Sequence, residues 1–480
     1  RLEHRPVIVG TGPAGLFCGL MLARAGYRPL LLERGETARE RKRTVDRFWK
    51  TGELVPDSNV QFGEGGAGTF SDGKLNTLVK DPKGRNRLVL ETFVQAGAPE
   101  EILYWNKPHL GTDVLTCVVE RIREEILSLG GEVRFGTKVT DIDVQDGAVR
   151  GVRVRRRMGA ETKAGAEVKA KAETEEYLPC EALVLAIGHS ARDTFAMLAQ
   201  KQIPMEQKAF AVGVRIEHPQ ELVNESQYGR DYPPQLPAAS YKLTRKVSGD
   251  RGVYSFCMCP GGYVVNASSE EGFLAVNGMS YQARDGRNAN SAMIVTVRPE
   301  DFGGTDVLAG MEFQRKLERA AYRAGGGHVL AGVEFQRRLE RAAYRAAGGK
   351  IPVQLLADFQ KKQRSLSLGE VEPSMKGAWE FGDVRGIFPE VLSAALEEGI
   401  LGCEHILPGF SRGDALLSGV ESRTSSPVRI LRDERLESAV RGLYPCGEGA
   451  GYAGGITSAA MDGVKTAEAV AARYRTGKED

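Results

Sequence analysis

The chain has 480 residues, and 41% of them are hydrophobic, 27% charged and 7% aromatic, which is an ordinary composition for a globular protein. The 65 basic and 63 acidic residues leave a net charge of +2, so no overall field favours nucleic acid or an anionic membrane as the main partner. The sequence contains no run of about 18 uncharged apolar residues, so no membrane span is predicted.

Glycine and cysteine carry more information than the charge does. Glycine accounts for 58 of the 480 residues, or about 12%, against a usual share of roughly 7%. The seven cysteines are an odd number and do not suggest a disulfide framework, so a reducing compartment such as the cytoplasm is expected. Because the sequence starts at Arg1, a preceding segment such as a plastid-targeting peptide is also considered.

The first segment reads as a strand, a glycine turn and a helix. Residues 6–9 lead into Gly10-Thr11-Gly12-Pro13-Ala14-Gly15, and a second strand-like run ends at Glu33, 23 residues after Gly10. Glycines alone would fit a plain turn, but the whole pattern is typical of a dinucleotide-binding unit, with the pyrophosphate at the helix N-terminus and the acid at a ribose hydroxyl. Cofactor contacts are predicted at Gly10, Gly12, Pro13, Ala14, Gly15, Glu33 and Arg34.

Two loops follow that suit a cofactor pocket. Segment 63–73 contains five glycines and two hydroxyl side chains, which favours close approach to a ligand over a flexible surface loop, and Gly65, Gly66 and Thr69 are predicted contacts. In segment 107–113, Lys107 and His109 are candidate catalytic residues, with His109 as an acid or base. A structural or exposed histidine is the alternative.

The middle of the chain predicts a second domain. The runs 210–216, 252–256, 262–267 and 292–297 read as strands of an antiparallel sheet. Cys257 and Cys259 are one residue apart, so on a strand both thiols would point the same way. They are either redox partners of a cofactor or small buried hydrophobic residues.

Two segments have unusual sequence patterns. Residues 307–314 return as 329–336, a near-repeat with a period of 22, and each copy reads as an amphipathic helix. A local duplication that adds a surface helix is favoured over a basic docking face. The basic run 155–157 with the stretch 161–176 reads as a solvated hairpin.

The C-terminal segment contains a second glycine-rich helix start. Residues 442–457 read as a strand and a glycine-rich loop, followed by a helix over 458–473. This segment resembles the C-terminal flavin-binding motif of the glutathione-reductase and p-hydroxybenzoate-hydroxylase superfamily. The resemblance implies that Glu448 binds ribityl or phosphate-side groups and that the helix start faces the flavin, through Gly455, Ile456 and Thr457.

The same resemblance extends over the rest of the chain. Segment 181–190 resembles the superfamily's strand and Ala-x-Gly turn, which places Gly188 at the cofactor, and 131–144 resembles the adenine-contacting strand around Val139. Segments 61–75, 107–113 and 421–429 further resemble a family of FAD-dependent dehydrogenases found in bacteria and plastids. FAD is the cofactor implied, and no metal site is predicted.

The predicted fold is α/β: a discontinuous, Rossmann-like FAD-binding domain over 1–203 and 376–480, with a mainly antiparallel β substrate domain inserted over 204–375. Between residues 190 and 430 we find no second dinucleotide motif, so NAD(P)H, if it is the donor, docks transiently. The function expected is an FAD-dependent oxidoreductase that transfers hydride between the flavin and a small-molecule substrate. The alternatives are a noncatalytic or RNA-associated flavoprotein and a flavin monooxygenase.

Overall fold

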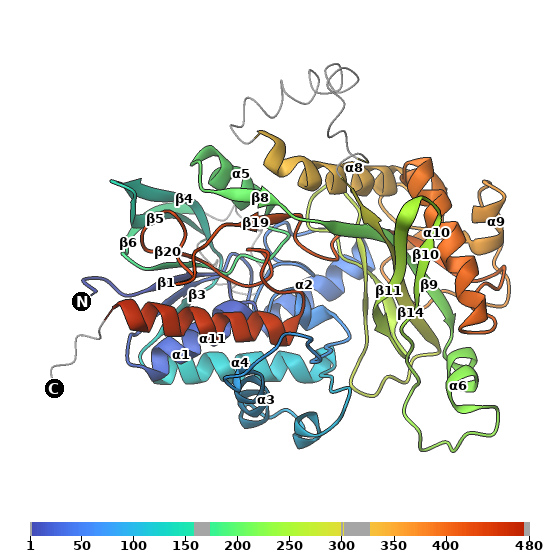
Figure 1. Cartoon of the computed structure of the whole chain (residues 1–480), viewed down its shortest axis with the longest axis horizontal. Coiled ribbons are helices and arrows are strands. Elements are labelled where there is room, and N and C mark those ends of the chain that lie inside the picture. The colour runs from blue at the N-terminus through green and yellow to red at the C-terminus, as the bar shows by residue number, and fades with distance from the viewer. Residues whose placement is uncertain (1, 158–172, 299–300, 302–326, 475–480) are drawn as a thin grey trace, which may run out of the picture.

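A five-stranded parallel sheet forms the centre of the first of two lobes (Figure 1). The computed structural model describes residues 2–157, 173–298, 301 and 327–474. Four of the five strands are buried along their whole length, as expected for a parallel sheet covered on both faces. In spatial order the strands are β20 (Leu443–Pro445), β7 (Leu183–Leu185), β1 (Val7–Val9), β2 (Leu30–Leu32) and β3 (Glu132–Arg134).

Alternate residues of these strands face two different layers. Ile8 and Leu31 point into a core shared with helices, whereas Val7 and Leu32 point into a core shared with Val152 of a small antiparallel sheet. The helices are α1 (Pro13–Arg24), α4 (Thr112–Ser128) and α11 (Ile456–Arg473), and the small sheet consists of β4 (Thr137–Gln145), β5 (Ala148–Arg157) and β6 (Glu173–Pro179). The first lobe therefore has three layers, which confirms the predicted Rossmann-like domain.

The second lobe is built on a seven-stranded sheet, which confirms the predicted antiparallel domain. Every neighbouring pair is antiparallel except the last, which is parallel. The predicted strands at 210–216, 252–256 and 292–297 are three of its members. In spatial order the sheet contains β10 (Thr244–Val247), β11 (Arg251–Cys259), β14 (Asn288–Val297), β9 (Phe210–Pro219), β18 (Leu416–Glu421), β15 (Ile351–Leu355) and β17 (Trp379–Phe381).

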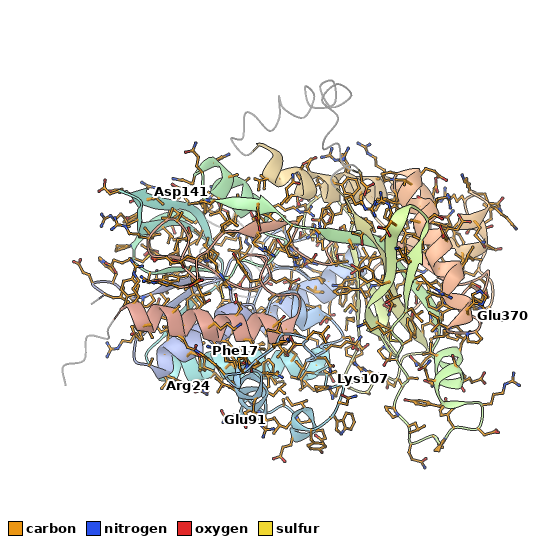
Figure 2. All side chains as sticks on the ribbon, viewed as in Figure 1. Phe17, Arg24, Glu91, Lys107, Asp141 and Glu370 are labelled. Atoms are coloured by element: carbon orange, nitrogen blue, oxygen red, sulfur yellow. The ribbon has the colours of Figure 1, made fainter. Side chains whose placement is uncertain are left out.

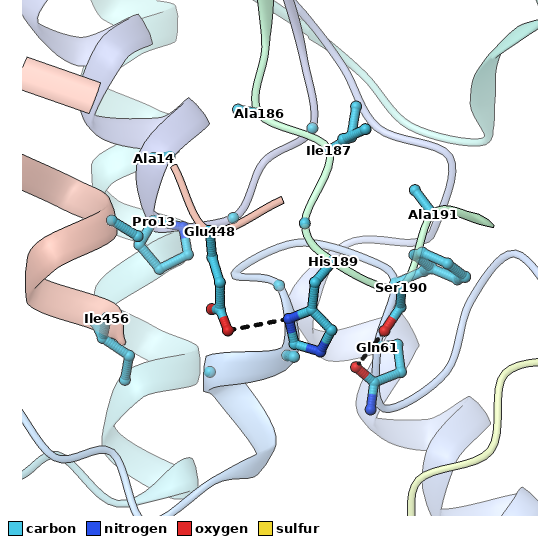
Figure 3. A pocket seen from close by; sticks show the side chains of 18 of the residues that line it. Pro13, Ala14, Gln61, Ala186, Ile187, His189, Ser190, Ala191, Glu448 and Ile456 are labelled. Atoms are coloured by element: carbon cyan, nitrogen blue, oxygen red, sulfur yellow. Dashed lines mark hydrogen bonds and ion pairs between the residues drawn. The ribbon is translucent and has the colours of Figure 1, made fainter. Parts of the chain in front are cut away.

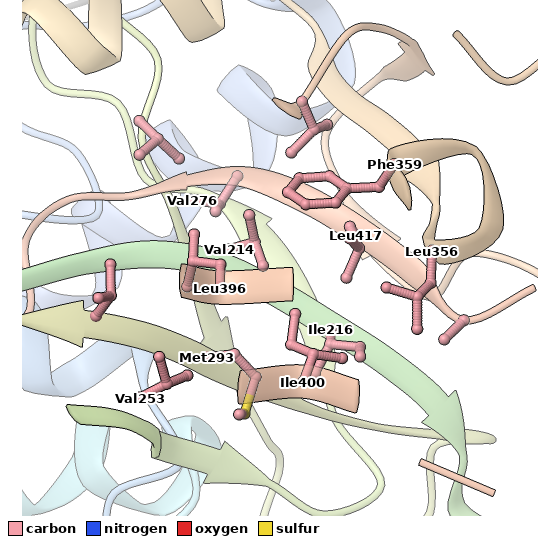
Figure 4. Close-up of a cluster of buried hydrophobic side chains, with 14 of the residues drawn as sticks. Val214, Ile216, Val253, Val276, Met293, Leu356, Phe359, Leu396, Ile400 and Leu417 are labelled. Atoms are coloured by element: carbon pink, nitrogen blue, oxygen red, sulfur yellow. The ribbon is translucent and has the colours of Figure 1, made fainter. Parts of the chain in front are cut away.

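Helix α10 (Glu390–Gly402) covers one face of this sheet. Leu396 and Ile400 belong to the same buried cluster as Val253 and Met293 (Figure 4). A Cβ at Gly399 would lie 2.5 Å from Val253, so glycine is required where the helix lies directly on β11. Burial of each large apolar side chain in this cluster stabilises the lobe by about 1.5–3 kcal/mol.

The return to the first lobe occurs later than the sequence predicts. The expected boundary is residue 376, but β17, α10 and β18 all belong to the second lobe. The chain crosses between lobes at β8 (Met205–Gln207) and β19 (Val428–Ile430), which pair with each other. Strand β18 pairs with β9 about 200 residues earlier, a long-range pairing that local sequence patterns do not reveal.

Smaller elements complete the two lobes. The predicted strand at 262–267 is β12, which belongs to a separate three-stranded sheet. The Nε1 atom of Trp49 donates a 2.9 Å hydrogen bond to the carbonyl of Asn266 and so joins the lobes. The smaller helices and strands of the two lobes are α2 (Ala38–Thr51), α3 (Arg85–Gln95), α5 (Arg192–Gln200), α6 (Gln220–Tyr228), α9 (Leu356–Gln360), β12 (Tyr263–Asn266), β13 (Val276–Met279) and β16 (Met375–Lys376).

The two unusual sequence segments are described only in part. The second copy of the near-repeat forms the predicted helix, α8 (Ala331–Ala346), but Phe335 and Leu339 lie in the core of the second lobe, so α8 is more than a surface helix. The first copy, 307–314, lies outside the described residues. The basic run 155–157 ends β5, which pairs with β6 as the predicted hairpin; its connection, 158–172, also lies outside the described residues.

Candidate functional site

A cavity of about 360 Å³ lies at the carboxyl ends of the parallel strands and extends to the second lobe. Ligands in open parallel sheets bind at this edge. The structure brings together predicted residues from both ends of the chain and from its middle. Those that line the cavity are Gly10, Gly12, Pro13, Ala14, Glu33, Arg34, Gly66, Val139, Gly188, Glu448, Gly455 and Ile456.

The remaining predicted cofactor residues lie behind this lining. A Cβ at Gly15 would lie 1.9 Å from the carbonyl oxygen of Gly10, so Gly15 serves the packing of α1 on the turn. The Thr457 hydroxyl donates a 2.8 Å hydrogen bond to the carbonyl of Leu75. These residues support the cavity rather than line it: Gly15, Gly65, Thr69 and Thr457.

The glycine turn before α1 has the shape of a phosphate cradle. Gly10 has φ +100°, and a Cβ there would lie 2.3 Å from the carbonyl oxygen of Ala186. Gly12 precedes the first helical residue and has no side-chain cap, so the first amides of α1 are left for a ligand. A Cβ at Gly12 would meet nothing closer than 3.8 Å, so it would project into the cavity instead of into protein.

Helix α11 begins at the same cavity in the same way. Its N-cap residue, Gly455, makes no side-chain hydrogen bond, and both Gly455 and Ile456 line the cavity. Two helix N-termini therefore point their amides and partial positive charge at one space. This arrangement fits a dinucleotide with a pyrophosphate and an electron-accepting ring.

His189 and Glu448 form an ion pair on the cavity wall (Figure 3). The Nδ1 atom of the histidine lies 3.0 Å from Oε1 of the glutamate, and both residues line the cavity. The other ring nitrogen, Nε2, is buried and has no hydrogen-bond partner. Such a nitrogen calls for a ligand partner. His189 is not among the residues predicted from the sequence, although its position directly after Gly188 was a usable signal.

Glu33 holds the cradle together. One carboxylate oxygen accepts hydrogen bonds from the amide and the hydroxyl of Thr11, at 2.9 and 2.8 Å. The other oxygen accepts from the amides of Gly35 and Gly63, at 2.9 and 3.1 Å. The carboxylate is thus already supplied with four donors, and the ribose contact expected of it stays a prediction.

Arg34 lies at the same end of the cavity. Its guanidinium is 3.0 Å from Asp193 and stacks 4.4 Å above the ring centre of Phe62. The pKa of Asp193 is lowered to about 2, because the attraction of Arg34 and Lys138 outweighs the effect of burial, which would raise it. Paired and stacked in this way, Arg34 presents a flat, fixed surface.

The second lobe supplies the opposite end of the cavity. Arg215 on β9 is fully buried and lies 2.8 Å from Glu421, which lines the cavity. The same guanidinium donates to Asn277, another lining residue, at 2.9 Å. Burial raises the pKa of Glu421, despite the attraction of Arg215. Arg215 was not predicted from the sequence, because it lies within a strand that is otherwise mostly apolar.

Arg423 lines the cavity but its charge is already satisfied. Its guanidinium lies 3.0 Å from Glu340 of α8, which also contacts Arg192 at 2.8 Å. Burial alone would raise the pKa of Glu340, but the two arginines lower it well below its usual range. Of the other polar residues of segment 421–429, Thr424 also lines the cavity, whereas Arg429 pairs with Glu206 at 3.0 Å.

The two predicted catalytic residues, Lys107 and His109, lie away from the cavity lining. Lys107 is exposed near the junction of the lobes, 3.5 Å from the hydroxyl of Ser240 (Figure 2). His109 is buried 3.3 Å from the carbonyl of Gln282, and burial, followed by repulsion from Arg284, lowers its pKa. Their catalytic roles stay predictions, and the geometry does not favour them.

Comparison with known proteins places the chain in a family. A family model described as "FAD-dependent protein, C-terminal domain-like" matches residues 209–329 and 326–424. An uncharacterized protein of Clostridium beijerinckii is 50% identical over 476 residues, which cover 98% of this chain and 82% of that protein. The chain belongs to this family of FAD-dependent proteins. The matched region ends at residue 424, close to the observed return to the first lobe.

Solved structures show more distant similarity. The E. coli quinol-fumarate reductase subunit FrdA is 13% identical, with a TM-score of 0.40, over 99% of this chain and 71% of that chain. A triple mutant of the flavin-dependent brominase Bmp2 is 12% identical, with a TM-score of 0.41, over 99% of this chain and 82% of that chain. Within the described part of the chain, no helix combines the length and apolar character that crossing a membrane requires.

Proposed function

We propose that this member of the family is an FAD-dependent oxidoreductase that transfers hydride between the flavin and a small molecule held against the second lobe. The main support for the proposal is that one cavity extends from the first lobe to the second. It runs from the phosphate cradle at Gly12 to Phe256 and Asn277 of the second lobe. One end therefore suits a nucleotide, and the other presents a separate protein surface to whatever lies between the lobes.

The cofactor end fits FAD on two observations. Gly12 leaves a space that a side chain would fill, and the Nε2 atom of His189 is buried without a partner. In this proposal the N-terminus of α1 binds the pyrophosphate, Glu448 and His189 bind groups near the ribityl chain, and the N-terminus of α11 lies at the flavin. When bound, FAD supplies the hydride chemistry, and the protein supplies binding, orientation and electrostatics.

The substrate end of the cavity is polar. Lys74 lines the cavity, lies 3.4 Å from the buried Asp72 and donates to the carbonyl of Met258. Asp72 also pairs with Arg284, so two cations share one carboxylate. The surplus positive charge would orient a polar or anionic substrate. Glu421, whose pKa burial raises, lines the same cavity.

An anaerobic titration tests this function. The purified protein, reconstituted with FAD if necessary, is mixed with NADH, NADPH and a panel of reduced metabolites while the absorbance of oxidised flavin is followed. We expect FAD to bind with about one molecule per chain and at least one donor to bleach it. Failure to bind FAD would contradict the assignment of the cofactor, and bound FAD that no donor reduces would favour a noncatalytic flavoprotein.

A further inference from the structure

Strand β11 places two cysteines at the substrate end of the cavity. Cys257 lines the cavity and is half-buried, whereas Cys259 is buried behind it. The strand is not regular here: Phe256 pairs with Ala292 and Cys259 pairs with Asn290, so two residues face one on β14. Cys257 has φ +46°, as expected for such a bulge. The bulge aims one thiol into the cavity and keeps the other beside it.

The surroundings of Cys257 favour its thiolate. The thiol of Cys259 donates a 3.2 Å hydrogen bond to the carbonyl oxygen of Cys257. The neighbouring Cys259 thiol and the charges of Arg215 and Lys74 lower the pKa of Cys257 against the opposing effects of burial and Asp72. The guanidinium of Arg215 lies 3.8 Å from the sulfur of Cys259 and 2.8 Å from the carbonyl oxygen of Cys257. A thiolate is the reactive form of cysteine.

No other cysteine of the chain has this combination. All seven lie in described parts of the chain and all are free. Burial raises the pKa of four of them, which are Cys18, Cys180, Cys403 and Cys446. Cys117 is exposed on α4 in the first lobe and does not line the cavity. Cys446 also lines the cavity, but burial raises its pKa. Cys257 is therefore the lining thiol whose pKa is lowered, and Cys259, whose pKa is raised by burial and by its neighbour, lies directly behind it.

We propose that Cys257 and Cys259 form a redox-active dithiol that reduces small disulfides entering the cavity, an inference that rests on the proposed function. The Cys257 thiolate attacks one sulfur of a disulfide R–S–S–R, so that a mixed disulfide forms and RS⁻ leaves. Cys259, after giving up its proton, attacks the sulfur of Cys257, so that the intramolecular disulfide forms and the second RS⁻ leaves. Two protons, one from each protein thiol, complete two molecules of RSH. Reduced FAD is the donor of the two electrons and two protons that restore the dithiol.

The test is a redox titration read by mass spectrometry, without any assay of turnover. The anaerobic FAD-loaded protein is equilibrated in glutathione buffers of different potential, alkylated and digested with trypsin. The peptide between Arg251 and Arg284 contains Cys257 and Cys259 and no other cysteine. We expect both to lose alkylation together, with the ratio of dithiol to disulfide changing tenfold for about 30 mV. Two cysteines that stay alkylated throughout the series would overturn the proposal.

Single substitutions separate the two roles. Cys259→Ser should accumulate a mixed disulfide of Cys257 with glutathione, whereas Cys257→Ser should leave Cys259 unmodified. Cys117→Ser, on the exposed face of α4, is the matched control and should titrate like the unchanged protein. The flavin absorbance of each variant reports whether that variant is folded. If a variant does not fold, the titration of the unchanged protein still decides whether the two cysteines form a redox-active pair. Modification of Cys259 in Cys257→Ser would contradict the assigned order of attack.

The result also distinguishes this proposal from the proposed function. If a donor bleaches the flavin while both cysteines remain alkylated at every potential, the dithiol is wrong and the oxidoreductase stands. If the cysteines titrate as a pair but the protein binds no FAD, the dithiol stands and the cofactor assignment is wrong.

Discussion

The Nδ1 atom of His189 lies 3.0 Å from Oε1 of Glu448, although the two residues belong to opposite halves of the sequence. They are neighbours because each follows one of two adjacent parallel strands, β7 and β20. The contact joins the segment after β7 and the segment after β20 on one wall of the cavity (Figure 3). It fixes the orientation of the imidazole and leaves Nε2 buried without a hydrogen-bond partner.

Replacement of His189 by alanine should weaken FAD binding about tenfold. The substitution removes a ring that lines the cavity and leaves Glu448 without its partner, and the loss of one hydrogen bond of about 1.4 kcal/mol corresponds to a factor of ten in affinity. The dissociation constant is measured by adding FAD to the apoprotein and following flavin fluorescence.

The control for this experiment is a second histidine–glutamate pair in the first lobe. His4 lies 2.6 Å from Glu181 near the surface and does not line the cavity. His4→Ala should leave FAD affinity unchanged. Equal losses in the two variants would show that the effect is one of general stability, not of the site.

Gly12→Ala should separate cofactor binding from folding. Gly12 has φ −68°, which alanine adopts without strain, and the added methyl group meets no protein atom within 3.4 Å. We expect the free energy of unfolding to change by less than about 1 kcal/mol, the usual scale for an N-cap position. FAD affinity should fall roughly ten- to a hundredfold, because the methyl group occupies space at the pyrophosphate.

Gly252→Ala is the matched control for Gly12→Ala. Gly252 lies on β11 with an ordinary φ, and its nearest neighbour for an added Cβ is 4.0 Å away, outside the cavity. Both unfolding and FAD affinity should stay close to those of the unchanged protein. Normal FAD binding by Gly12→Ala would show that the cradle does not hold the pyrophosphate.

The features that could be predicted from the sequence are those determined by residues close together in the chain. The turn at Gly10 and Gly12 and the alternating strands of the second lobe are short-range patterns, because backbone conformation and side-chain period determine them directly. The predicted domain boundary at residue 376 was wrong, because the pairing of β18 with β9 across some 200 residues leaves no local pattern in the sequence. Arg215 and Glu340 were missed for the same reason, because only the distant partner of each residue explains its burial.

Glu340→Gln should destabilise the protein strongly at neutral pH. Glu340 is fully buried between Arg192 and Arg423, so its replacement leaves Arg423 without its acidic partner and Arg192 with Glu270 alone, which costs about 3–5 kcal/mol. Its pKa is below the usual 4.5 in the folded state, so its stabilising effect is complete above pH 4.5 and is lost as the pH falls below that value. Urea unfolding at pH 7 and at pH 4 measures both effects. The destabilisation by Glu340→Gln should be smaller at pH 4, and an equal effect at both values would contradict the ion-pair explanation.

Glu217→Gln should have the opposite dependence on pH. Glu217 is fully buried on β9, where it accepts hydrogen bonds from Asn288 and from the amide of Ser374, at 3.0 and 2.9 Å. Its second oxygen has no partner. Burial outweighs these hydrogen bonds and raises the pKa to about 7 from the usual 4.5.

The folded state therefore keeps the proton of Glu217 over a range in which the unfolded chain releases it. The stability of the unchanged protein should fall as the pH rises from about 4.5 to 7, because the unfolded state then binds fewer protons than the folded state. Glutamine stays neutral, so Glu217→Gln should lose this dependence and be the more stable protein at pH 8. Urea unfolding at pH 5, 6, 7 and 8 measures the difference, with the exposed Glu271→Gln as the control. A variant that is less stable than the unchanged protein at pH 8 would show that the Glu217 carboxylate is ionised and stabilising in the folded state.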